Sequence, residues 1–185
     1  MSAIMAFVRG GIAEFKSLSS APRELWVIYI LKMLESYAYF SQSLILPLYL
    51  NSFGISDIDA GWMIGTYGVL ISVFGFGVGM LVDNLGVRKS LMIGSMISFV
   101  ARLIISLTSS KAILTGTLFS LMPLGMAMGI PVMSTGIRRH TTLENRGFAF
   151  AIFYSVMNIA ALTSGALVDV FRNAITQSVA VAAAA

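Results

Sequence analysis

Long apolar stretches separated by short polar segments dominate this sequence. There are five of them, at residues 25–50, 60–82, 90–108, 112–133 and 147–168. A helix that crosses a bilayer needs about 20 mostly apolar residues, and each stretch meets or approaches that length. Because backbone polar groups in hydrocarbon must be satisfied within their own segment, the pattern predicts five transmembrane helices. A membrane barrel would instead need alternating strands of about ten residues, which these continuous stretches do not provide.

The composition supports an all-α integral membrane protein. Hydrophobic residues make up 57% of the chain and charged residues only 11%, whereas a soluble domain carries roughly 25% charged residues. Cysteine is absent, so disulfides and thiolate metal sites are excluded. We find no nucleophile–histidine–acid set, no metal cluster and no phosphate-binding glycine loop. The sequence therefore predicts neither an enzyme nor a cofactor, and the net charge of +4 is low for a nucleic-acid partner.

The chain divides into three parts. Residues 1–22 place apolar side chains on one helical face, which suits an amphipathic helix at the membrane surface. A targeting peptide and a frayed terminus are the alternatives. Residues 23–173 form the predicted five-helix transmembrane bundle, and residues 174–185 look like the beginning of a sixth helix that stops.

Basic residues in the loops predict the orientation. The residues that fall on one side are Arg9, Lys16, Arg23, Arg88, Lys89, Arg138, Arg139 and Arg146, against Lys111 and Arg172 on the other. Because loops rich in lysine and arginine stay inside, the N-terminus is expected on the cytoplasmic side, or on the matrix or stromal side of an organelle. The sequence does not say which membrane holds the protein.

A row of small residues marks the second apolar stretch. Its members are Gly61, Gly65, Gly68, Ser72, Gly75 and Gly79. Spacings of three and four place them on one helical face, where they let another helix approach closely. We therefore expect this row to pack against a neighbouring helix, in preference to binding a ligand.

Polar residues interrupt the first apolar stretch. Lys32 and Glu35 share a helical face, and Tyr39 and Gln42 continue its polar character. One hypothesis places these four residues on a pathway, with Glu35 binding a proton or Lys32 an anionic solute. The alternative is a local ion pair whose lysine reaches the membrane surface. Arg102 lies near the end of its stretch, so we expect its head group to reach the opposite surface.

The segment between the second and third stretches carries a recognisable motif. It reads Gly79-Met-Leu-Val-Asp83-Asn-Leu-Gly86-Val-Arg88-Lys89. This resembles the signature loop of the major facilitator superfamily, although Val87 replaces its first basic residue. The resemblance implies a gating loop formed by Gly79, Asp83, Gly86, Arg88 and Lys89.

A second segment supports the same resemblance. Residues 144–158, which begin Glu-Asn-Arg-Gly, are similar to the start of the fifth helix in that superfamily. The resemblance adds Arg146 to the gating loop and predicts that Asp83 pairs with Arg138, Arg139 or Arg146. The alternative is that these basic side chains face anionic lipid.

Two further comparisons with that superfamily are weaker. Residues 32–40 faintly resemble the first-helix motif of proton-coupled peptide transporters, but only the second acid and the aromatic residues match. The arginine that proton-coupled antiporters often carry in the fourth helix is replaced by Leu121. Neither comparison identifies a substrate or a coupling ion.

The resemblance implies the amino-terminal part of a facilitator bundle, covering five of twelve helices. It favours a secondary active transporter that moves a small solute by alternating access, with symport of a proton as the coupling hypothesis. Its partners would be the lipid bilayer and the solute or proton. The alternative is a truncated relative without transport activity that serves as a structural subunit of a larger membrane complex. The second hypothesis adds other membrane subunits as partners.

Overall fold

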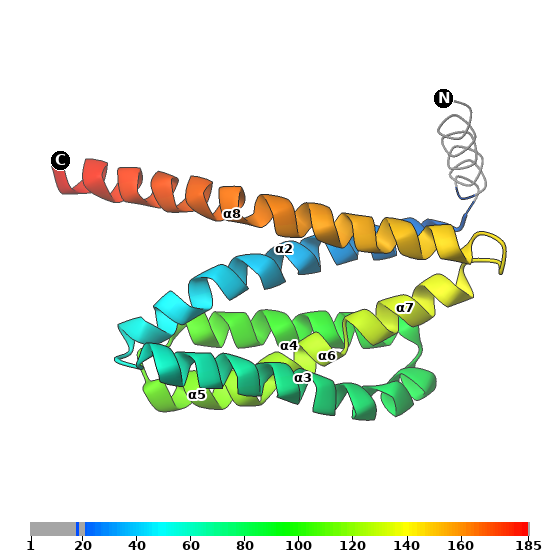
Figure 1. Cartoon of the computed structure of the whole chain (residues 1–185), viewed down its shortest axis with the longest axis horizontal. Coiled ribbons are helices and arrows are strands. Elements are labelled where there is room, and N and C mark those ends of the chain that lie inside the picture. Colours follow the sequence, from blue (N-terminus) through cyan, green and yellow to red (C-terminus); the bar gives the residue numbers. More distant parts are fainter. Residues whose placement is uncertain (1–17, 19–20, 185) are drawn as a thin grey trace.

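The computed structural model describes residue 18 and residues 21–184. Within that part of the chain it contains the helices labelled in Figure 1. Their bounds are α2 Arg23–Ser52, α3 Asp57–Leu85, α4 Val87–Leu107, α5 Lys111–Phe119, α6 Leu121–Ala127, α7 Ile130–Arg139 and α8 Arg146–Ala184. The predicted amphipathic segment, residues 1–22, lies almost entirely outside the described residues.

The five predicted membrane helices are present, and one of them is broken. Four segments are long and apolar enough to cross a bilayer, namely Asp57–Leu85, Val87–Leu107, Lys111–Arg139 and Arg146–Ile175. The helix α2 has 30 residues, but its charged side chains make it less apolar than these four. The chain is therefore an integral, multi-pass membrane protein.

The span Lys111–Arg139 consists of the three short helices α5, α6 and α7. The first interruption falls at Ser120, whose φ and ψ of −124° and −79° are not helical. Pro123 lies in the first turn of α6 and Pro131 in the first turn of α7. A proline has no N–H to donate and is tolerated in the first turn of a helix, so each interruption comes just before a proline.

The helix α8 runs without interruption through residues 174–184, which the sequence had suggested as the beginning of a separate helix. Its 39 residues extend over about 58 Å at 1.5 Å per residue. Figure 1 shows its carboxyl-terminal end projecting past the other helices.

The helices form two layers in Figure 1, with α2 and α8 above and α3, α4, α5 and α6 below, while α7 rises toward α8. The two helices of the upper layer are joined by a buried hydrogen bond. In it the Tyr29 hydroxyl of α2 donates to the Ala149 carbonyl of α8 at 3.0 Å. In the lower layer α4 packs along α6.

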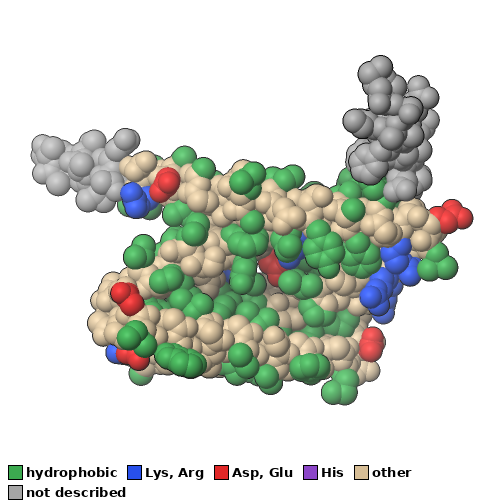
Figure 2. Space-filling view, in the orientation of Figure 1, with side chains coloured by type: hydrophobic (Ala, Val, Ile, Leu, Met, Phe, Trp, Pro, Cys, Tyr) green, Lys and Arg blue, Asp and Glu red, His purple; other side chains and the backbone are tan. Residues whose placement is uncertain are grey.

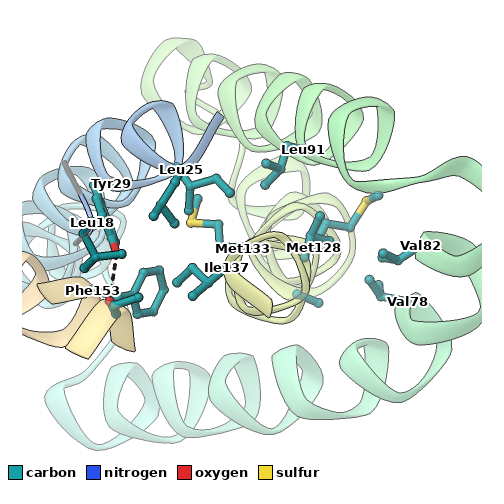
Figure 3. Close-up of a cluster of buried hydrophobic side chains, with 14 residues drawn as sticks. Leu18, Leu25, Tyr29, Val78, Val82, Leu91, Met128, Met133, Ile137 and Phe153 are labelled. Atoms are coloured by element: carbon teal, nitrogen blue, oxygen red, sulfur yellow. Dashed lines mark hydrogen bonds between the residues drawn. The ribbon is translucent and has the colours of Figure 1, made fainter. Parts of the chain in front are cut away.

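Two apolar clusters occupy the two ends of the bundle. The first cluster joins the start of α2 to the end of α3 and the starts of α4 and α8, and Figure 3 shows it around Leu25, Met133 and Phe153. The second cluster joins the end of α2 to the starts of α3 and α5, around Leu50 and Leu118. The polar residues of α2 lie between the two clusters along the helix axis.

The row of small residues on α3 does not pack against the described part of the chain. A Cβ added to the glycines of that row would meet no atom within 4 Å, at positions 61, 65, 68, 75 and 79. The prediction that this row packs against a helix of this chain is therefore wrong for the described residues. Close packing occurs instead on α4 and α6, where a Cβ on Gly94 would lie 2.6 Å from the Met128 Cβ.

Candidate functional site

A buried ion pair lies in the middle of α2. The Lys32 Nζ is 3.2 Å from the Glu35 Oε2, and the two side chains are 4% and 18% exposed. The ammonium also lies 5.2 Å from the centre of the Phe153 ring of α8, a geometry that adds a cation–π attraction. The predicted local pair is therefore present, but Lys32 is enclosed between α2 and α8 and does not extend to the membrane surface.

Glu35 faces a cavity of about 310 Å³ between α2, α4, α6 and α7. Arg102 of α4 lines the same cavity, together with Ser95 and Ser98. Gly129 makes room for the acid, because a Cβ at this position would collide with the Glu35 Oε1. Figure 2 shows the hollow between the two layers, with acidic and basic side chains visible inside it.

The orientation of Arg102 differs from the prediction. Its head group was expected at the membrane surface, but its Nη2 lies 3.5 Å from the Met126 Sδ in the interior of the bundle. Its Nε is buried and has no hydrogen-bond partner among the described residues. The helix α6 packs along α4, so Met126 of α6 lies within reach of the guanidinium.

A smaller pocket of about 80 Å³ lies further along α2, against α3. Tyr39, Gln42 and Tyr67 line it. The Gln42 Oε1 and the Tyr67 Oη are buried and have no hydrogen-bond partner in the described structure. Buried polar atoms normally have partners, so these two mark a place where water or a solute would be held.

The four predicted pathway residues of α2 thus lie on one polar face. Lys32 and Glu35 form the ion pair, Glu35 faces the larger cavity, and Tyr39 and Gln42 face the smaller one. The sequence did not single out Tyr67, because a lone tyrosine in an uncharged helix is common. It also assigned Ser95 and Ser98 no role, since a hydroxyl gives no sign of the face to which it points.

The segment predicted as a gating loop connects α3 to α4. Gly86 has φ of 78° and ψ of 162° and is the single residue between the two helices. Gly79 lies in the last part of α3, while the side chains of Asp83, Arg88 and Lys89 are exposed.

The expected partner of Asp83 is not found in the described structure. Its carboxylate forms no hydrogen bond or ion pair with Arg138, Arg139 or Arg146 within the described residues. Arg146 instead donates to the carbonyl oxygens of Arg138 and Thr141, at 3.2 and 3.3 Å. These bonds close the connection between α7 and α8, so the guanidinium is used locally.

The Gly86→Ala substitution should destabilise the full-length protein by about 1–3 kcal/mol, because an L side chain is strained at this combination of φ and ψ. Thermal unfolding in detergent would measure the effect. The control is Gly77→Ala, at a position inside α3 where an added Cβ meets nothing within 4 Å. Equal stability of the two variants would contradict the prediction.

Comparison with known proteins gives one finding on the family. The model of the Major Facilitator Superfamily matches residues 28–183, from the first turns of α2 almost to the end of α8. No curated protein matches the sequence. The match covers most of the chain and includes the cavity, the smaller pocket and the loop between α3 and α4. Membership implies a transporter-type membrane protein, a class that is generally not enzymatic. The chain belongs to the Major Facilitator Superfamily.

Proposed function

We propose that this chain carries the amino-terminal helices of a secondary active transporter, which moves a small solute across the membrane by alternating access. The observation that supports it is the charged cavity between the two apolar clusters. Glu35 lies about 18 Å along α2 from Arg23, and Arg102 lies about 22 Å along α4 from Val87. Glu35 is therefore near the middle of α2. Arg102 lies about 8 Å from the end of α4, but its head group turns into the bundle. Ionisable side chains inside a membrane bundle are costly and usually serve a function.

The polar face of α2 is the proposed pathway. The larger cavity would hold the solute beside Glu35 and Arg102, and the smaller pocket beside Tyr39 and Gln42 would continue the route toward the end of α2. Glu35 is the candidate proton site, because its carboxylate is partly exposed to the cavity while its Lys32 partner is enclosed.

The loop between α3 and α4 is the proposed gate. Asp83 at the end of α3 is exposed and lies outside any ion pair in the described structure, so it is free to gain a partner in another state. Arg88, Lys89 and Arg146 belong to the same side of the membrane in the proposed orientation, with the N-terminus inside.

Cysteine accessibility tests this function directly, because the chain has no native cysteine. In the full-length protein, the Ser95→Cys thiol in the cavity should react with a membrane-impermeant maleimide applied from either side. Ser52→Cys and Asn84→Cys, exposed at opposite ends of the bundle, should each react from one side only. These two controls also test the proposed orientation.

Alternating access predicts that reaction from the two sides changes in opposite directions when a transported solute is added. If the Ser95→Cys thiol reacts from one side only under every condition, the transport proposal is wrong. The result would then favour a structural subunit without transport activity.

A further inference from the structure

The guanidinium of Arg102 is incompletely satisfied. An arginine side chain offers five N–H donors, but the described residues give it a single hydrogen bond, to the weak acceptor Met126 Sδ at 3.5 Å. The Nε is buried without a hydrogen-bond partner among the same residues. A buried donor without an acceptor costs free energy, so a ligand that accepts hydrogen bonds here would recover it.

The charges around the cavity favour a negative ligand. Lys32 and Glu35 pair across 3.2 Å. Arg102 faces Glu35 across the cavity without forming an ion pair in the described structure, so these three charges sum to +1. The attraction between this charge and an anion is strengthened by the low dielectric constant of the surroundings. A cationic ligand would instead have to compete with Lys32 for the carboxylate of Glu35.

The rest of the cavity indicates the shape of that ligand. Apart from the two charges and the serines, its walls are formed largely by Leu31, Leu34, Phe99, Met128 and Met133. A volume of about 310 Å³ is at the lower end of the range for small-molecule sites. The cavity thus offers one charged end and a largely apolar remainder.

We propose that the solute is a small organic carboxylate with an apolar body, held through its carboxylate by Arg102. This inference rests on the proposed transport function and adds the chemical class of the solute. The planar guanidinium fork matches the two oxygens of a carboxylate, and the apolar walls accept the hydrocarbon part. Arg102 is a binding residue in this proposal.

Three probes of nearly equal shape, together with inorganic phosphate, test the inference. The purified full-length protein would be heated with benzoate, benzamide, benzylammonium or inorganic phosphate while its unfolding temperature is measured. Benzoate should raise the unfolding temperature in a saturable way, and the other three should not. Arg102→Gln should weaken benzoate binding by at least about tenfold, which corresponds to one lost charged hydrogen bond.

Two further variants guard against a simple folding defect. Arg102→Lys keeps the charge but lacks the planar fork, so it should fold and bind benzoate with an intermediate affinity. Lys111→Gln removes an exposed cation that does not line the cavity and should bind benzoate as the unchanged protein does.

The proposal is overturned if benzoate does not stabilise the protein, or if it stabilises Arg102→Gln equally well. Stabilisation by benzamide or benzylammonium, but not by benzoate, would also overturn it. The proposed transport function would then still hold, for a solute of another class. If phosphate stabilised the protein as well as benzoate does, the site would bind oxyanions in general. The proposal that the solute has an apolar body would then be wrong. Failure of the transport proposal is seen separately, as one-sided reaction of the Ser95→Cys thiol.

Discussion

Glu35→Gln should destabilise the full-length protein by about 3–5 kcal/mol, the usual cost of leaving one member of a buried ion pair alone. The reason is that Lys32, with its side chain only 4% exposed, would keep a buried charge without an acid beside it. The free energy of unfolding, measured by denaturant titration in detergent micelles, gives the effect.

The opposite substitution should cost less. In Lys32→Met the acid stays partly exposed to the cavity, which Arg102 also lines, so its charge keeps a favourable environment. The double variant Lys32→Met/Glu35→Gln should recover most of the loss, because neither buried charge remains. The two single effects are therefore expected to be far from additive.

A matched control separates burial from pairing. Asp57→Asn weakens an exposed interaction in which the Asn51 Nδ2 donates to the Asp57 Oδ1 at 2.6 Å, and exposed polar pairs of this kind contribute little to stability. The prediction fails if Glu35→Gln is as mild as Asp57→Asn, or if the double variant is less stable than Glu35→Gln.

Gly125→Ala should destabilise the protein by about 1–3 kcal/mol, the range for an added methyl group in a well-packed interior. A Cβ at this position would lie 2.7 Å from the Ser98 backbone nitrogen and would also touch its hydroxyl. Since the obstacle includes backbone, α4 and α6 would have to move apart. The cavity lies between these helices, so the unfolding temperature and benzoate binding should both decrease.

The control uses the same substitution on α3. In Gly75→Ala the added Cβ meets no atom within 4 Å, and alanine favours a helix more than glycine does. This variant should therefore be as stable as the unchanged protein or slightly more so. Equal losses for Gly125→Ala and Gly75→Ala would show that the contact between α4 and α6 does not carry the effect.

Local features of the sequence determined the helices. Continuous apolar runs must become helices in a bilayer, because the backbone there has no other partner for its polar groups. The loop from Gly79 to Lys89 and the match over residues 28–183 then gave the family. The pair of Lys32 and Glu35 was also predictable, since a spacing of three residues places both side chains on one helical face.

The tertiary structure decided which faces meet, because many apolar helix faces are chemically equivalent in a membrane. The glycine row of α3, which the sequence favoured for packing, meets nothing in the described chain, while Gly125 on α6 meets Ser98. For the same reason Arg102 turned inward to Met126 and not toward the surface. A side chain's position along a helix follows from sequence, but its neighbours depend on how the helices rotate and cross. Those rotations bring Glu35 of α2 and Arg102 of α4 to the same cavity.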